Sequence, residues 1–118
     1  MPKYNIHELC RFTTEFLRLK LGKGPKNIKG YSLPGKIILE MYEYLTPLER
    51  QVASFNGADK VKSMREHYME CSHDEYIQKV SLILGEEISH CLVVFDVVRD
   101  EAFFILVLGQ KKGDDEVS

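Results

Sequence analysis

The sequence has 118 residues, of which 44% are hydrophobic and 29% are charged. These values are typical of one globular domain and exclude an intrinsically disordered chain. The formal net charge of −2 argues against a nucleic-acid-binding protein, because such proteins normally present a strongly basic surface.

Membrane and secretion signals are both lacking in the sequence. Glu8 and Arg11 lie where a signal peptide would have its apolar run, so we expect no secretory leader. The longest apolar run, Ala102 to Leu108, is far shorter than the ~20 residues that a membrane-spanning helix needs. We therefore expect a protein without a transmembrane segment.

The charges are unevenly distributed along the chain. Residues 1–36 carry eight basic and two acidic side chains, a net charge of +6, whereas residues 37–118 carry eight basic and sixteen acidic ones, a net charge of −8. This asymmetry indicates a docking surface for an anionic partner. The alternative is that the charges lie on solvated helix faces.

The first 45 residues are predicted to form a helix, a loop and two strands. Apolar residues at helical spacing predict a helix from about Ile6 to Leu21, which Gly22 ends. The loop Lys23-Gly24-Pro25-Lys26 follows. Two strands then flank Leu33-Pro34-Gly35, a sequence that suits a type II turn.

The second strand is predicted to run from Lys36 to Tyr44, with the alternate residues Ile37, Leu39 and Met41 on one face. After it, Thr46-Pro47-Leu48-Glu49 predicts the start of a short helix. Threonine can cap the helix, proline suits its first position, and the glutamate can return a hydrogen bond to the cap. This helix is expected to stop near Asn56-Gly57.

A longer helical stretch is predicted from Ala58 to Leu84. Its apolar stripe is predicted at Val61, Met64, Tyr68 and Cys71. Because Ser72 and Glu75 form a second capping signal, the stretch is either one kinked helix or two helices.

Two strands, about Ile88 to Val98 and Ala102 to Leu108, are predicted from their β-branched and aromatic residues. Residues 111–118 are predicted to be a disordered tail. The order α-β-β-α-α-β-β predicts an α+β fold in which residues 1–110 form a single domain. We expect a four-stranded, largely antiparallel sheet with helices packed on one face.

Two segments, Leu21-Gly22-Lys23-Gly24-Pro25-Lys26 and Leu45-Thr46-Pro47-Leu48-Glu49-Arg50, together resemble the MpsC-like family of bacterial proteins. That family is named for a sodium-translocating, membrane-potential-generating system. Its pattern has a G-(R/K)-G-P loop after the first helix and an L-T-P-x-E helix start after the hairpin. The resemblance covers about residues 5 to 109, and it departs from the family's charged helix at Cys71-Ser72-His73-Asp74.

The resemblance implies a bacterial protein that is cytoplasmic, or peripheral to the inner face of the membrane. It implies an accessory role in a cation or bicarbonate transport system, with a membrane-transporter subunit as partner. It supplies no catalytic residue, ligand or cofactor, and in this sequence we identify none.

Two groups of residues are candidate sites by their composition. Lys23, Gly24 and Lys26 could hold an anion, although a helix cap and turn at Gly22 and Pro25 explain the same residues. Thr46, Pro47 and Glu49 are explained as a structural capping motif, and Arg50 as part of a solvated helix face.

Metal and thiol chemistry are not expected. Histidines and cysteines lie near one another in sequence at His67, Cys71, His73, His90 and Cys91. They lack the paired short spacings of zinc sites. The three cysteines, Cys10, Cys71 and Cys91, are expected to be reduced and packed in apolar surroundings, as in a cytosolic protein.

Two functions follow from these observations. The first is a non-enzymatic accessory or regulatory protein that forms a homodimer and docks on another protein. The alternative is a sensor that binds a small anion or a nucleotide near Lys23 and Lys26. The homodimer is expected because a sheet with helices on one face leaves its other face uncovered, with Ile38, Tyr42 and Tyr44 on it. The competing possibility is that the Ala58–Leu84 helix folds over that face.

Overall fold

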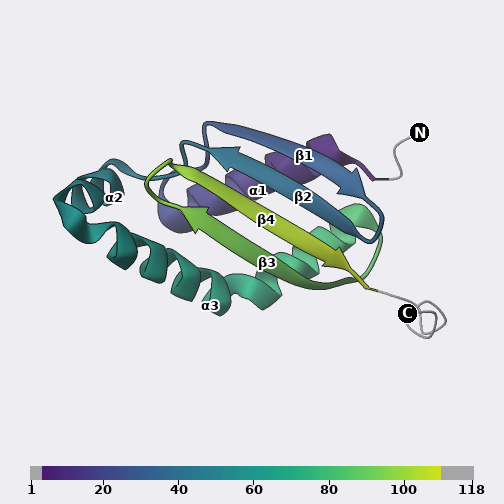
Figure 1. Ribbon diagram of the computed structural model, residues 1–118. Coiled ribbons are helices and arrows are strands. Elements are labelled where there is room, and N and C mark those ends of the chain that lie inside the picture. The colour runs from purple at the N-terminus through teal and green to yellow at the C-terminus, as the bar shows by residue number, and fades with distance from the viewer. Residues whose placement is uncertain (1–3, 110–118) are drawn as a thin grey trace.

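The computed structural model describes residues 4–109, and the elements follow the predicted order (Figure 1). The helices are α1 (Ile6–Leu21), α2 (Pro47–Val52) and α3 (Ala58–Leu84), and a kinked segment, η1 (Ala53–Gly57), joins α2 to α3. The strands are β1 (Asn27–Leu33), β2 (Lys36–Tyr42), β3 (Ile88–Asp96) and β4 (Glu101–Leu108). The tail predicted at residues 111–118 lies outside the described residues.

The four strands form one antiparallel sheet in the order β1-β2-β4-β3, so β2 and β4 occupy its centre. The predicted turn at Pro34-Gly35 joins β1 to β2, and Gly35 has a φ of 78° there, which glycine adopts without a steric penalty. In the central pairing, Ile38 lies opposite Ile105 and Tyr42 opposite Glu101. The predicted α+β class and antiparallel sheet are confirmed.

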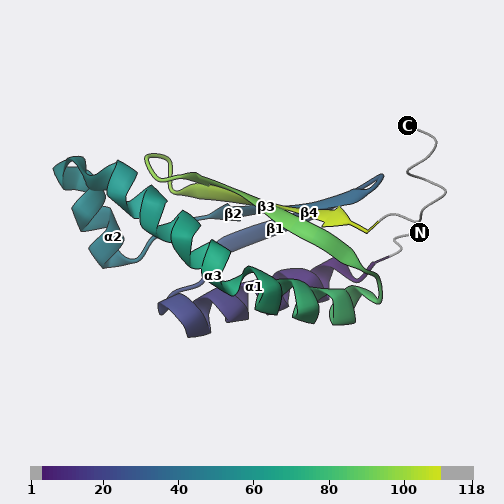
Figure 2. The same ribbon diagram turned by 90° about the horizontal axis from the view of Figure 1, so that it is seen from below.

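Both long helices pack on the same face of the sheet (Figure 2). Helix α1 contacts β1 and α3 contacts β3. The alternate residues Ile37, Leu39 and Met41 of β2 point into this helical layer and are buried, as predicted. The competing possibility that the Ala58–Leu84 helix covers the opposite face is wrong, because α3 lies beside α1.

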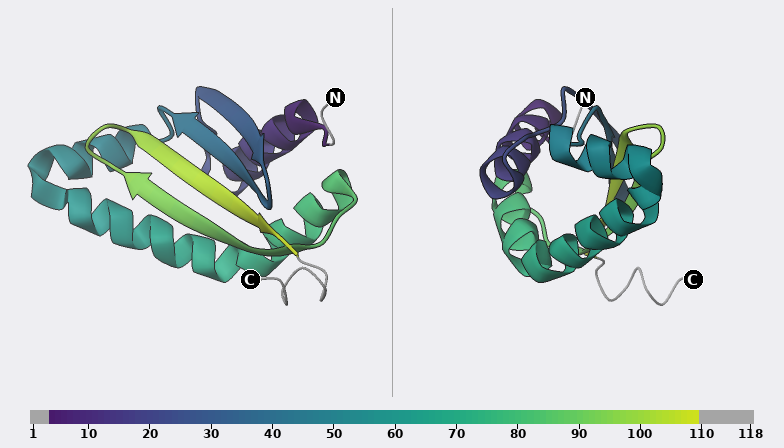
Figure 3. Two further views of the ribbon diagram at one scale, coloured as in Figure 1. Left: turned by 45° about the vertical axis from the view of Figure 1, so that its right-hand side comes forward. Right: turned by 90° about the vertical axis from the view of Figure 1, so that its left-hand side faces the viewer.

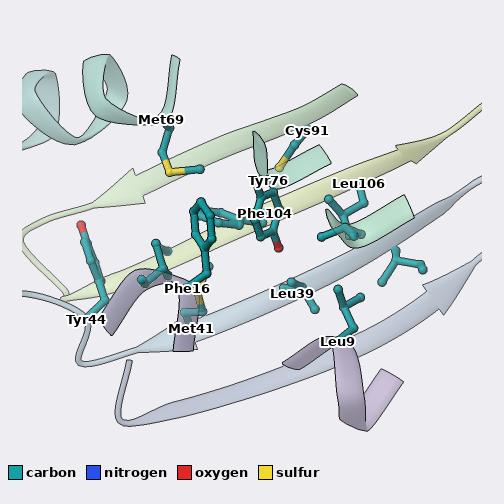
Figure 4. Close-up of a cluster of buried hydrophobic side chains, with 14 of the residues drawn as sticks. Leu9, Phe16, Leu39, Met41, Tyr44, Met69, Tyr76, Cys91, Phe104 and Leu106 are labelled. Carbon is teal, nitrogen blue, oxygen red and sulfur yellow. The ribbon is translucent and has the colours of Figure 1, made fainter. Parts of the chain in front are cut away.

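The hydrophobic core fills the space between the helices and the sheet (Figure 4). The rings of Tyr76 on α3 and Phe104 on β4 meet edge to face with centroids 5.7 Å apart. The Tyr76 hydroxyl shares a hydrogen bond of 2.7 Å with the Thr13 hydroxyl on α1. Burial raises the pKa of Tyr76 well above its ordinary value. The tyrosine therefore stays neutral and ties α1 to α3 inside the core.

Strand β2 ends at Tyr42, two residues earlier than predicted. Glu43 has a φ of 55°, which turns the chain out of the sheet, and the Tyr44 amide donates to the Asp100 carboxylate at 2.9 Å. Tyr44 is consequently buried in the core. Its predicted place on the uncovered face of the sheet is wrong.

Helix α3 is continuous over 27 residues, so the two-helix alternative is wrong. The Ser72 hydroxyl donates to the Tyr68 carbonyl one turn earlier, at 3.0 Å, and does not cap a second helix. The apolar stripe was also misplaced, because Met64 and Cys71 are exposed. The buried stripe comprises Val61, Arg65, Met69, Ser72, Tyr76 and Val80.

The segment formed by α2, η1 and the first turns of α3, residues 47–64, extends beyond the end of the sheet (Figure 3). We call this segment the helical tip. Phe55 and Asn56 have non-helical backbone angles, and this break lets the chain reverse between α2 and α3 close to the predicted stop. No helix within residues 4–109 is long and apolar enough to cross a membrane.

Candidate interaction surfaces

The helical tip begins with a complete capping box. The Thr46 amide donates to a Glu49 carboxylate oxygen at 2.8 Å, and the Glu49 amide donates to the Thr46 hydroxyl at 3.1 Å. Pro47 occupies the start of the helix, where its missing N–H leaves no hydrogen bond unmade. The Thr46, Pro47 and Glu49 motif thus starts α2 as its sequence indicates.

Glu49 also forms a buried ion pair with Arg65 of α3. The Arg65 guanidinium donates from Nε to Oε2 and from Nη2 to Oε1 of Glu49, both at 2.7 Å. Arg65 is 2% exposed, donates to the Tyr44 carbonyl at 3.1 Å, and lies over the Tyr44 ring. Burial opposes ionisation of Glu49, but the hydrogen bonds from Arg65 and Thr46 outweigh it and lower the pKa of Glu49. The charged pair fixes α2 against α3.

Asp100 forms a second connection, between the β3–β4 turn and the start of α2. One carboxylate oxygen accepts from the amides of Tyr44 and Leu45 at 2.9 Å each. The other oxygen lies 2.9 Å from Arg50 Nη2. Arg50 is exposed, as predicted for a solvated helix face, and in addition it forms this ion pair.

Sequence reasoning missed Arg65 and Asp100, although one signal for Arg65 was present. Arg65 lies one helical turn from both Val61 and Met69, so it interrupts the true apolar stripe with a charge. A lone arginine on a buried stripe predicts a buried acidic partner. Asp100 gave no comparable signal, because its function depends on chain contacts more than fifty residues away.

The loop after α1 is built from internal contacts. Gly22 ends the helix with a φ of 89°, and a Cβ on Gly24 would lie 2.6 Å from the Thr14 carbonyl oxygen. The Lys23 ammonium donates to the Gly24 carbonyl at 3.2 Å and also to the Glu43 carbonyl. Pro25 is buried.

Lys26 has its side chain exposed, whereas its amide donates to the Tyr42 carbonyl at 3.0 Å. The structure thus gives Lys23 and Gly24 structural contacts within the chain. An anion site at Lys23, Gly24 and Lys26 stays a prediction.

The three thiols differ in their surroundings. Cys91 is buried, and burial raises its pKa to about 12. Cys10 is half-buried, and burial raises its pKa as well. Cys71 is exposed, which corrects the expectation that all three are packed in the core.

His73 on α3 accepts a hydrogen bond from the Cys91 amide at 3.1 Å through Nε2. This contact ties the helix to the edge strand β3. Within residues 4–109 no group of three or more His, Cys, Asp or Glu side chains is placed to hold a metal ion.

The sheet face opposite the helices is uncovered, and we call it the outer face (Figures 1 and 2). Its residues come from alternate positions of all four strands: Lys29, Tyr31, Leu33, Lys36, Ile38, Glu40, Tyr42, His90, Leu92, Val94, Asp96, Glu101, Phe103, Ile105 and Val107. A hollow on this face is lined by apolar side chains and by four charged ones: Ile38, Val94, Phe103, Ile105, Glu40, Asp96, Arg99 and Glu101.

The helical tip and the adjoining β3–β4 turn carry the other concentration of exposed apolar side chains. Leu48, Phe55 and Val98 are 70%, 77% and 85% exposed. Between the tip and the β3–β4 turn lies a hollow of about 350 Å³, lined by Ala53, Val98 and others. Val98 lines this hollow, whereas Leu48 and Phe55 are not among its lining residues. Large apolar side chains exposed on one part of a surface are typical of protein-binding sites.

Comparison with known proteins gives one match. Residues 5–110 match the family model described as Na⁺-translocating membrane potential-generating system (MpsC). No curated protein and no solved structure matches the chain.

Proposed function

The chain belongs to the MpsC family, and from this premise we propose that it is a non-enzymatic accessory protein of a sodium-translocating, membrane-potential-generating system. It acts by docking on a protein component of that system, from the cytoplasmic side of the membrane. The docking form is a homodimer.

The observation that carries this proposal is the exposed apolar surface of the helical tip and the adjoining β3–β4 turn. Leu48, Phe55 and Val98 expose most of their apolar surface to solvent, although a monomer would be more soluble with polar residues there. The Glu49–Arg65 pair anchors the tip, which presents Leu48 and Phe55, and Asp100 joins the β3–β4 turn, which presents Val98, to Arg50 of α2. A rigid apolar surface loses little conformational entropy on binding, which favours its use as a docking site.

The charges around the tip favour a protein partner over a lipid surface. Basic side chains such as Arg99 and Lys60 alternate there with acidic ones such as Asp59 and Asp96. Anionic lipid headgroups attract clusters of basic residues without acidic neighbours. We therefore propose that the partner is an apolar segment of a membrane-embedded subunit that the tip reaches at the membrane surface.

The non-enzymatic part of the proposal is supported by the surroundings of the carboxylates and the thiol that could otherwise act in catalysis. The Glu49 and Asp100 carboxylates are held by arginines and backbone amides, and the Cys91 thiol is buried with a raised pKa. A nucleophile or general base needs the opposite arrangement, with a pKa tuned toward neutrality and access to substrate.

Co-purification from membranes of the native host tests the docking. Wild-type protein, Phe55→Asp and Leu48→Asp are each used as bait after mild crosslinking, and recovered integral membrane proteins are quantified by mass spectrometry. The matched control is Leu82→Asp, because Leu82 is 82% exposed on α3 and lies near the helix end opposite the tip.

We expect wild type and Leu82→Asp to recover the same integral membrane protein, and the two tip variants to lose at least nine-tenths of it. Unchanged melting temperatures would show that the variants are folded. Equal recovery by all four baits would overturn the tip as the docking site. Wild-type binding to protein-free vesicles of 30% phosphatidylglycerol would instead indicate a lipid surface and contradict the protein partner.

A further inference from the structure

The outer face is divided along the strand direction into a basic end, an apolar middle and an acidic end. At the end beside the β1–β2 turn, Lys36 and His90 flank Val107 in one row across the sheet. At the opposite end, Glu101 pairs with Tyr42 on one side and with Asp96 on the other. Arg99 in the adjoining turn lies 3.8 Å from Asp96, so this end has two acidic side chains against one basic one. The two rows between them are mostly apolar.

The middle rows form the largest apolar part of this face. Ile105 lies between Ile38 and Leu92 in one row, and Phe103 lies between Glu40 and Val94 in the next. Leu92 and Val94 are half exposed. A β-sheet with helices on only one face normally buries its second apolar face against another layer.

Glu40 is the one acidic group in these middle rows. Its carboxylate oxygen Oε1 accepts from the Tyr42 hydroxyl at 2.9 Å and from the Tyr31 hydroxyl at 3.3 Å. It also lies opposite Lys29 on the neighbouring strand. These groups of the same chain stay beside the Glu40 carboxylate when water is removed. A second protein layer could therefore cover Glu40 without leaving its charge unpaired.

We infer that the outer face is the interface of the homodimer, with the second copy turned about a two-fold axis that is perpendicular to the strands. The axis runs between the two middle rows. Each strand then lies over the same strand of the partner in the opposite direction, within the ~30° twist usual for packed sheets. This inference gives the proposed homodimer its interface and rests on that part of the proposed function, but not on the helical tip.

Charge complementarity selects this axis. The perpendicular axis places the basic end of one copy over the acidic end of the other, so that His90 lies over Asp96 of the second copy, and Lys36 lies over Tyr42, beside Glu101 on the neighbouring strand. The apolar Ile105 and Phe103 then meet at the centre. A two-fold axis parallel to the strands would instead place each row over the same row of the second copy, so that the two basic ends face each other and the two acidic ends face each other, and like charges repel.

Light scattering on the purified full chain gives the first test. At 50 µM we expect twice the 13.7 kDa chain mass. Val94→Glu should raise the dissociation constant at least tenfold, because it buries a carboxylate in the apolar middle. Val94 is 52% exposed on an edge strand, so the monomer should stay folded. The control Leu82→Glu lies on the helical side and should leave the mass unchanged.

A charge exchange tests the axis. Lys36→Glu and Glu101→Lys should each weaken the dimer, and the double variant should restore it to within threefold of wild type. Lys36 and Glu101 are six pairs apart along the β2–β4 ladder, roughly 20 Å, so no contact within one chain can produce this rescue.

A monomer at 50 µM would overturn the inference, as would a dimer that Val94→Glu leaves unchanged. A double variant as weak as the single ones would overturn the axis. None of these results depends on the membrane partner. The dimer can therefore fail while the tip variants still lose that partner, and docking can fail while the dimer persists.

Discussion

Arg65 and Glu49 form a two-pronged ion pair inside the protein, with both hydrogen bonds at 2.7 Å and both side chains almost inaccessible to solvent. The pair links the long helix α3 to the first turn of α2. The same glutamate closes the capping box with Thr46. The position of the helical tip therefore depends on one carboxylate with two sets of partners.

Replacing Arg65 alone should be strongly destabilising. Arg65→Met leaves the Glu49 charge buried without its partner, and such losses cost about 3–5 kcal/mol. The double variant Arg65→Met/Glu49→Gln should recover part of this, because glutamine keeps the capping hydrogen bond without a charge. Urea unfolding measures both. A loss below ~1 kcal/mol for Arg65→Met would contradict the structural importance of the pair.

The same pair should make the free energy of unfolding depend on pH in the acidic range. The pKa of Glu49 is lowered in the folded protein from its ordinary value of 4.5. The unfolded chain therefore takes up a proton at a higher pH than the folded chain does. The contribution of Glu49 is fully present above about pH 4.5 and is lost as the pH falls through the folded pKa.

Unfolding free energies between pH 7 and pH 3, compared for wild type and Glu49→Gln, measure this contribution. We expect the difference between the two proteins to be constant above about pH 5 and to shrink below pH 4.5. A difference that grows as the pH falls would show that the sign is wrong.

The substitution Tyr44→Phe should not lower the stability of the protein. Among the buried polar side-chain groups of the described residues, the Tyr44 hydroxyl is the one without a hydrogen-bond partner. Burial raises the pKa of Tyr44. A buried polar group without a partner costs free energy. Tyr44→Phe should therefore be neutral or stabilise the protein by up to ~1 kcal/mol in thermal or urea unfolding. A loss above ~1 kcal/mol would indicate that the hydroxyl has a partner.

The sequence predicts those features of the structure that depend on interactions between residues close together in the chain. Gly22 ends α1, and Thr46 caps α2 with Glu49, because these signals act within one helical turn. The alternation of Ile37, Leu39 and Met41 likewise predicts which face of β2 is buried.

Most of the failures involve distant partners. Tyr44 leaves the sheet because Asp100, 56 residues later, takes its amide hydrogen bond. The stripe on α3 was misread because Arg65 and Ser72 are polar residues at buried positions. Neither the apolar exposure of Phe55 nor the division of the outer face into charged ends could be read from periodicity. Both depend on which strands and turns become neighbours.

The three thiols should react at different rates. Cys71 is exposed, whereas Cys91 is buried with a pKa raised to about 12, and burial also raises the pKa of Cys10. Since the thiolate is the reactive form, a disulfide reagent at pH 8 should modify one thiol in native protein quickly. Cys71→Ser should remove the fast phase and leave the slow ones. A fast phase that survives in Cys71→Ser would contradict the burial of Cys91 or Cys10.

Binding of the purified protein to membrane vesicles from the native host, with the cytoplasmic side outward, tests the central claim most directly. The proposed docking predicts saturable binding that is lost in Phe55→Asp, retained in Leu82→Asp, and abolished when the vesicles are first treated with protease. Binding that survives the protease treatment, or that Phe55→Asp retains in full, would contradict docking on a membrane protein through the helical tip.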